Sequence, residues 1–167
     1  MSNLKIGSHF VGKDYPTIFM PEIGCYFQKN VEEAMNTLKE IKNEDITLVK
    51  GEIAHSPEYV LNDGYIYNYQ TLKGPRARPY REIIEELILP KEVWLKLWKF
   101  AHNLGLESMI SAYDFEAMDL AVESGTSSLK IATANIVNIP LIRHASQSGL
   151  PIVFDTGKSN ISEIYNA

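Results

Sequence analysis

The chain has 167 residues, of which 45% are hydrophobic and 22% are charged, and its formal net charge is −5. An acidic chain without long runs of like charge lacks the basic face that a phosphate backbone requires, which argues against nucleic-acid binding. One cysteine excludes an internal disulfide framework, and no apolar run approaches the ~20 residues that span a bilayer. With no signal-peptide core in residues 1–10, we expect a single cytoplasmic domain over residues 1–167, without a membrane segment.

Apolar runs and helical patterns alternate along most of the chain. Residues 17–24 predict a strand, and residues 30–42 predict a helix with one apolar stripe and Asn30 as its N-cap. Residues 46–50 predict the next strand. A helix follows at 90–105, where Trp94 and Trp98 are expected to flank the apolar stripe.

The alternation becomes tighter in the second half of the chain. Because a crossover helix returns the chain to the same edge of a sheet, strands separated by helices are best interpreted as parallel. Together with the first half, this predicts about five parallel β-α units. The elements expected here are strand 107–113, helix 115–125, strand 127–133, helix 139–149, strand 151–157 and helix 159–167.

Residues 54–89 interrupt this alternation with a segment rich in tyrosine, glycine and proline. Its tail, 80–90, predicts a short helix. Tyr65, Tyr67 and Tyr69 alternate like one face of a strand, which is typical of packing or of an edge ribbon. Such a long insertion after the second strand is more often functional, or a partner surface, than idle.

Five parallel units allow two architectures, an open doubly wound sheet or part of a (β/α)8 barrel. A complete barrel needs about 250 residues, so the pattern alone favours the open sheet. No glycine-rich phosphate loop follows any predicted strand, which weakens a nucleotide-binding hypothesis.

Both architectures place a functional site at the carboxyl ends of the strands. Lysines at two of these ends suit an anionic ligand. One such lysine could instead form a Schiff base if its pKa were depressed, which is the aldolase-type alternative. The polar residues at the strand ends are Glu22, Lys50 with Glu52, Asp114, Lys130 with Thr133, and Asp155 with Thr156.

The remaining chemically active side chains give weaker signals. The four histidines are scattered without metal-ligand spacing, so no metal site is predicted from them. Cys25 follows the first strand and could face the site, although a buried free thiol is the more common role.

Three segments carry a family resemblance: residues 6–24, which end in "EIG", residues 80–125, which begin with "YREIIEELILPKEVW", and "LKIATANIVNIPLIRHASQSGLPIVFDTG" (129–157). In order and spacing they resemble the N-terminal half of the sialic acid synthase family. This family comprises the N-acetylneuraminate, pseudaminate and legionaminate synthases and spore-coat relatives. The resemblance implies a partial (β/α)8 TIM barrel with an insertion after strand 2.

The resemblance also implies a reaction, the condensation of phosphoenolpyruvate with an N-acyl hexosamine, assisted by a divalent metal (manganese or magnesium). Glu22 would be the catalytic residue that contacts the amino sugar. Lys50 and Lys130 would bind the phosphate and carboxylate of phosphoenolpyruvate, with the Thr133 hydroxyl beside them. Asp114, Asp155 and Thr156 would complete the substrate-binding group.

Four motifs depart from the family pattern. Cys25–Gln28 replaces Asn-His-Asn-Gly, Gly51–Glu52 replaces Phe-Gln, and Ala112 replaces a phosphate-contacting threonine. Asp155 replaces a serine that faces phosphoenolpyruvate, and a carboxylate there repels an anion by on the order of 1 kcal/mol or more. Asp155 is therefore expected to pair with Lys130 instead.

The chain also lacks the second half of the barrel, which holds the family's two histidine metal ligands. Five strands alone would leave two exposed edges. Either the chain is a truncated product, or a partner chain or second copy completes the barrel in an oligomer. The sequence thus leaves two hypotheses, a synthase that is incomplete as this chain and a non-catalytic sugar-binding or assembly subunit derived from the family.

Overall fold

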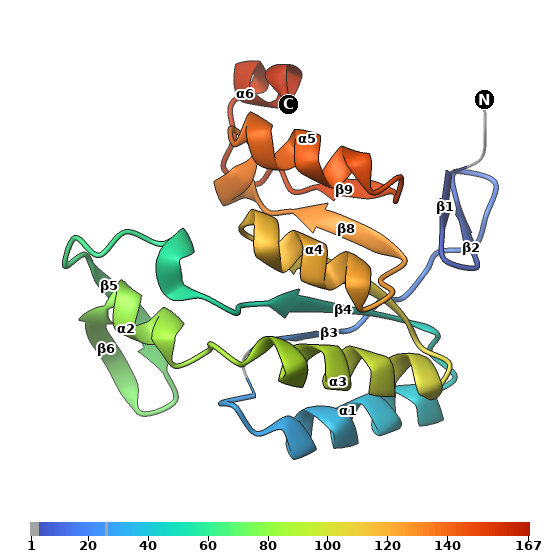
Figure 1. Cartoon of the computed structure of the whole chain (residues 1–167), viewed down its shortest axis with the longest axis horizontal. Coiled ribbons are helices and arrows are strands. Elements are labelled where there is room, and N and C mark those ends of the chain that lie inside the picture. Colours follow the sequence, from blue (N-terminus) through green and yellow to red (C-terminus); the bar gives the residue numbers. More distant parts are fainter. Residues whose placement is uncertain (1–3, 26) are drawn as a thin grey trace.

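The computed structural model describes residues 4–25 and 27–167; residues 1–3 and Tyr26, which belongs to the altered 25–28 motif, lie outside it. Its centre is a five-stranded parallel sheet whose strands follow one another in chain order. Figure 1 shows these strands crossing the middle of the molecule. They are β3 (Glu22–Gly24), β4 (Leu48–Ile53), β7 (Glu107–Ala112), β8 (Ser128–Ile131) and β9 (Ile152–Phe154).

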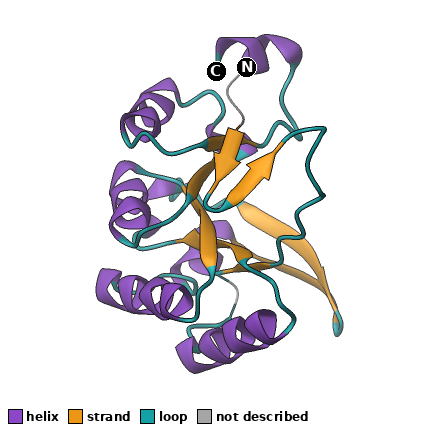
Figure 2. Cartoon of the chain, turned by 90° about the vertical axis from the view of Figure 1, so that its right-hand side faces the viewer, coloured by secondary structure: helices purple, strands orange, loops and turns teal. Residues whose placement is uncertain are grey.

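The helices that connect these strands form one layer on one face of the sheet (Figure 2). Right-handed crossovers between strands in sequential order place every connecting helix on the same side, whereas a doubly wound sheet has helices on both faces. The described sheet is therefore a barrel segment that does not close. The helices are α1 (Val31–Asn43), α3 (Lys91–Asn103), α4 (Phe115–Glu123), α5 (Ile139–Gln147) and, at the end of the chain, α6 (Ile161–Asn166).

The main core lies between the sheet and this helix layer. Alternate strand residues such as Val49, Ile110 and Leu129 face the helices and are fully buried. Trp94 and Trp98, which were expected to flank the apolar stripe of α3, are also fully buried. The buried face of α3 is wide because the helix packs on α1 and α4 as well as on the sheet, while Glu92, Lys96 and Lys99 remain exposed on its other face.

The opposite face of the sheet is covered at its amino end by a small hairpin that the sequence patterns did not predict. The hairpin pairs β1 (Leu4–Ile6) with β2 (His9–Val11). Ile6 packs there against Leu48 and Met109 in a second apolar cluster. The main-chain N–H of Ser8 donates to both oxygens of the Glu107 carboxylate, at 2.8 and 2.9 Å, which fixes the hairpin to β7.

The insertion after β4 forms the structure at the other end of the sheet, beside the carboxyl ends of the strands (Figure 1). It contains a short 3-10 turn (Pro57–Tyr59), the hairpin of β5 (Ile66–Thr71) and β6 (Gly74–Pro79), and α2 (Tyr80–Glu85). The predicted tail helix is thus confirmed. In the described part of the chain, no helix is long and apolar enough to cross a membrane.

Candidate functional site at the strand ends

Glu22, Lys50 and Glu52 form the first polar cluster on the face of the sheet away from the helices. Lys50 is only 6% exposed, and its ammonium group contacts the Glu22 carboxylate and lies 3.8 Å from Glu52 Oε1. The Cys25 thiol donates to Glu52 Oε2 at 3.6 Å. Burial first, and then the Glu52 and Glu22 carboxylates, raise the pKa of Cys25 to about 12. Lys50 is therefore a buried cation whose compensating charges come from this chain.

Lys130 and Asp155 form the second cluster, at the ends of β8 and β9. Lys130 Nζ lies 3.2 Å from Asp155 Oδ2, so the expected pairing of these two residues is present. Asp155 Oδ1 also accepts the Gly157 N–H at 3.1 Å, and Thr133 Oγ1 donates to the Asp155 carbonyl at 3.2 Å. The Gly157 N–H, followed by the Thr133 hydroxyl and the Lys130 ammonium, lowers the pKa of Asp155. The carboxylate is thus charged at neutral pH.

Ser111 lies between the two clusters and was not selected from the sequence. It is in register with Glu52 on one side and Lys130 on the other, so the three side chains share one row of the sheet face. Ser111 is 1% exposed, and among the described residues its hydroxyl has no hydrogen-bond partner. A buried unpaired hydroxyl is costly, and a bound ligand would satisfy it. The alternation of side chains along β7 was the signal that could have identified it.

Asp114 and Thr156 are placed differently. Asp114 is the N-cap of α4, where Oδ1 accepts the Ala117 N–H at 2.7 Å, and it lies 3.8 Å from His55 Nδ1. His55 Nε2 is 2.7 Å from Glu116 Oε2. Asp114 therefore has a structural role that explains its presence without a ligand. Thr156 follows β9 and is exposed.

A cavity of about 220 Å3 opens at the carboxyl ends of the strands, next to the first cluster. Glu52 of β4 and Cys25, which follows β3, line one side of it, and Tyr59, Tyr80 and Ile84 of the insertion line the other side. Catalytic sites of parallel α/β folds lie at this end of the sheet. The insertion thus forms a wall of the candidate site.

The donor side chains present do not form a metal site. Within residues 4–25 and 27–167, no group of three or more His, Cys, Asp or Glu side chains is arranged to hold a metal ion. Glu22 and Glu52, the acids nearest the site, are both engaged by Lys50. The residues that the structure describes therefore do not fit the divalent metal that the resemblance implies.

Comparison with known proteins agrees with this geometry. The sequence profile of the NeuB family matches residues 53–167. The chain is 29% identical over 96 residues to N,N'-diacetyllegionaminic acid synthase of Legionella pneumophila, covering 58% of this chain and 27% of that protein. It is 22% identical over all 167 residues to the spore coat polysaccharide biosynthesis protein SpsE of Bacillus subtilis, covering 44% of that protein.

Comparison with a solved structure shows a close likeness of fold at low sequence identity. The N-acetylneuraminic acid synthetase of Leptospira borgpetersenii superposes with a TM-score of 0.81 at 19% identity, over 99% of this chain and 53% of that one. The prediction of a TIM-barrel-like segment with five parallel β-α units is thereby confirmed. The chain spans about half or less of the length of the relatives that it matches.

Proposed function

Because the chain belongs to the NeuB family, we propose that it forms part of a synthase that condenses phosphoenolpyruvate with an N-acyl hexosamine to give a nonulosonic acid. The proposal draws its reaction class from the synthases among the relatives, which include legionaminic acid and N-acetylneuraminate-9-phosphate synthases. The same proposal includes a cytoplasmic location, where both kinds of substrate would be available.

The observation that carries the proposal is the polar row on the open face of the sheet. Strands β4 and β8 lie about 10 Å apart, with β7 between them, at the usual strand spacing of ~4.8 Å. An anion over β7 would have Lys130 and Ser111 in one row and Lys50 in the next row toward the amino ends of the strands, level with Met109. It could accept a hydrogen bond from the unpaired Ser111 hydroxyl. Two cations and a hydroxyl are the groups that bind a phosphate and a carboxylate.

Glu22 would serve the acceptor sugar in this proposal. Its side chain is 46% exposed although it contacts the buried Lys50, so one part of the carboxylate remains open to a ligand. A carboxylate beside a lysine can accept a hydrogen bond from a sugar hydroxyl or move a proton at the carbonyl end of the sugar. Phosphoenolpyruvate held by the lysines would then be oriented for attack on that carbon.

We infer that further polypeptide completes the barrel, either a partner chain, a second copy or a continuation of this one. Strands β3 and β9 are the two open edges of the sheet. Phe154 is in register with the fully buried Ile131 but is 37% exposed, and in α6 the Ile161 and Tyr165 side chains are 81% and 89% exposed. Apolar surface concentrated beside an open edge indicates a missing neighbour. The divalent metal, manganese or magnesium, would be bound by that additional polypeptide.

The test is a phosphate-release assay on the protein purified from its own cells in its native assembly. Phosphoenolpyruvate is supplied with and without an N-acyl hexosamine such as N-acetylmannosamine. If the chain is part of a synthase, inorganic phosphate should be released only when both substrates are present. The native assembly should also have a molar mass larger than the 18.9 kDa of these 167 residues, because it includes the polypeptide that completes the barrel. No release of phosphate from the intact assembly would refute catalysis.

A second candidate function is a non-catalytic sugar-binding or assembly subunit derived from the same family. The ion pairs favour it, because Lys50 and Lys130 are both already paired with carboxylates of this chain. Three carboxylates around two ammonium groups leave a net charge of about −1, which opposes an anionic ligand. Sugar binding by the assembly without phosphoenolpyruvate binding would support this candidate.

A further inference from the structure

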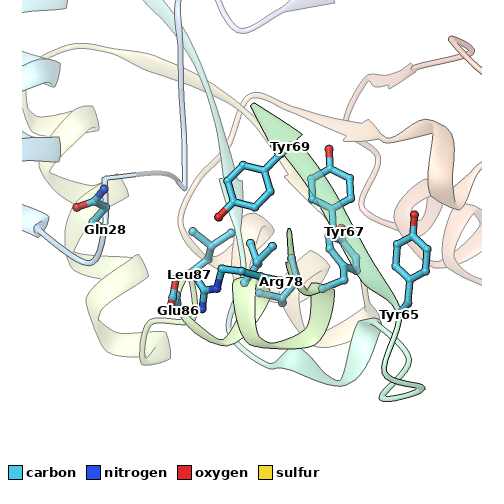
Figure 3. A pocket seen from close by; sticks show the side chains of 10 residues that line it. Gln28, Tyr65, Tyr67, Tyr69, Arg78, Glu86 and Leu87 are labelled. Atoms are coloured by element: carbon cyan, nitrogen blue, oxygen red, sulfur yellow. Dashed lines mark hydrogen bonds and ion pairs between the residues drawn. The ribbon is translucent and has the colours of Figure 1, made fainter. Parts of the chain in front are cut away.

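A second and larger cavity, of about 650 Å3, lies between the β5–β6 hairpin and α2. Figure 3 shows Tyr65, Tyr67 and Tyr69 in a row along the hairpin, with Arg78 and Glu86 side by side on another wall. Tyr80 completes the aromatic lining. We name this cavity, defined by the four tyrosines with Arg78 and Glu86, the tyrosine pocket. Its volume lies within the range of about 300–1,000 Å3 that is typical of small-ligand sites.

The aromatic rings form a continuous surface that the chain itself does not cover. The ring centroids of Tyr67 and Tyr69 are 5.9 Å apart with planes inclined by 18°, and those of Tyr67 and Tyr80 are 5.6 Å apart. Tyr65 is nevertheless 61% exposed and Tyr67 is 44% exposed. Flat apolar surface that remains exposed inside a hollow is typical of a ligand site rather than of a packed core.

The charges of the tyrosine pocket cancel. Arg78 donates to both carboxylate oxygens of Glu86, at 2.9 and 2.6 Å, and its guanidinium lies 3.8 Å from Glu82. A bidentate pair of this kind leaves no free cation for an anionic ligand. The rest of the lining consists of tyrosines, the Gln28 side chain and aliphatic groups. Such a pocket suits an uncharged ligand with an apolar face and a hydroxyl rim.

We propose that the tyrosine pocket is a binding site for an uncharged carbohydrate ring, whose C–H face packs on the tyrosines while its hydroxyls contact the polar groups of the rim. Tyr80, Ile84 and Leu87 line both this pocket and the strand-end cavity, so the bound sugar lies beside the candidate site. The inference stands apart from the proposed synthase reaction, because it requires neither phosphoenolpyruvate nor the lysines.

The experiment measures sugar binding without phosphoenolpyruvate, by saturation-transfer NMR and isothermal titration. The probes are N-acetylglucosamine, which is uncharged, glucosamine, which is a cation, and N-acetylneuraminate, which is an anion. The variants are Tyr67→Ala and Tyr69→Ala. The matched control is Leu72→Ala, because Leu72 is a fully exposed apolar residue at the turn of the same hairpin and does not line the pocket. Circular dichroism verifies that each variant is folded.

We expect saturable binding of the uncharged sugar in the millimolar range, weakened at least tenfold by Tyr67→Ala and unchanged in the Leu72→Ala control. Absence of binding at tens of millimolar N-acetylglucosamine would overturn the inference, and so would preference for either charged probe. A change of molar mass in Tyr67→Ala without loss of sugar binding would assign the hairpin to a protein interface instead. Loss of phosphate release alone would count against the synthase proposal and not against this site.

Discussion

Replacing Asp155 with asparagine removes the negative charge beside Lys130 while retaining the shape of the side chain. The asparagine Oδ1 can still accept the Gly157 N–H that Asp155 Oδ1 accepts at 3.1 Å. Lys130 loses its partner at 3.2 Å and becomes available to a ligand. If the strand ends bind phosphoenolpyruvate, Asp155→Asn should therefore bind it more tightly than the natural protein does.

The size of the effect follows from the geometry of the ion pair. A phosphate oxygen on the same ammonium group would lie about 5 Å from the Asp155 carboxylate, because two contacts of ~3 Å share one tetrahedral nitrogen. Two unit charges at that distance repel by about 3 kcal/mol at an effective dielectric of 20 and by about 0.8 kcal/mol in water. Asp155 is 41% exposed, so solvent screening places the value near 1 kcal/mol, or about fivefold in Kd.

Isothermal titration of phosphoenolpyruvate into the two proteins at low ionic strength measures this difference. The matched control is Asp119→Asn, an exposed aspartate of α4 that pairs with His144 at 2.6 Å. The difference for Asp155→Asn should shrink at high salt, as a screened charge effect does. Unchanged or weaker affinity in Asp155→Asn would refute the reasoning, because the carboxylate would then not face the ligand.

Three further predictions concern single side chains. Ser111→Ala should raise the free energy of unfolding by about 1 kcal/mol, because it removes a buried hydroxyl without a hydrogen-bond partner, yet it should weaken phosphoenolpyruvate binding severalfold. A lower free energy of unfolding in urea denaturation, or an unchanged affinity in titration, would contradict this. Gly51→Ala should lower the free energy of unfolding by about 1–3 kcal/mol in urea denaturation, because a Cβ at this position would overlap the Trp98 ring. In a Trp98→Leu background the same substitution should cost less, and an equal cost there would argue against this cause. Burial and the neighbouring carboxylates raise the pKa of Cys25 from 9.0 to about 12. The corresponding stability is present below the ordinary thiol pKa and is lost as the pH rises from there to the folded pKa, so the natural protein should lose more stability between pH 9 and pH 12 than Cys25→Ala does. Equal slopes of stability against pH would be the contrary result.

Local sequence signals predicted the helices and the N-cap of α1. Asn30 caps α1 by accepting the Glu33 N–H, and Asn160 forms a capping box with Glu163 at α6. These features depend on residues three positions apart, which a sequence shows directly. The pairing of Lys130 with Asp155 was also accessible, because both end neighbouring parallel strands.

The features that depend on distant segments could not be predicted in the same way. The strand expected at 17–24 is limited to Glu22–Gly24, because only those residues pair with β4. The β1–β2 hairpin has strands of three residues, too short for a periodic pattern, and it is held by Glu107 from far along the chain. The full burial of Trp94, beside the predicted stripe, follows from contacts of α3 with α1 and α4 that the sequence pattern does not show.

The candidate site was likewise predicted only in part. The positions of Glu22, Lys50 and Lys130 at the ends of strands could be read from the sequence. For Asp114, its role as the N-cap of α4 competes with its expected role in substrate binding. The tyrosine pocket could not be predicted from the sequence, because it is formed between two elements: Tyr80 lies on α2 and Tyr67 on β5. In the altered motif at Gly51, the missing side chain is explained by Trp98, which fills the space.

The most direct test of the central claim is whether the lysines at the strand ends bind phosphoenolpyruvate at all. The measurement is isothermal titration of phosphoenolpyruvate into the native assembly of the natural protein and of Lys130→Ala, with Lys158→Ala, an exposed lysine beyond β9, as the control. The account predicts saturable heat in the natural protein and in the control, and a loss of at least tenfold in affinity in Lys130→Ala. No heat at millimolar phosphoenolpyruvate in the natural assembly would contradict it.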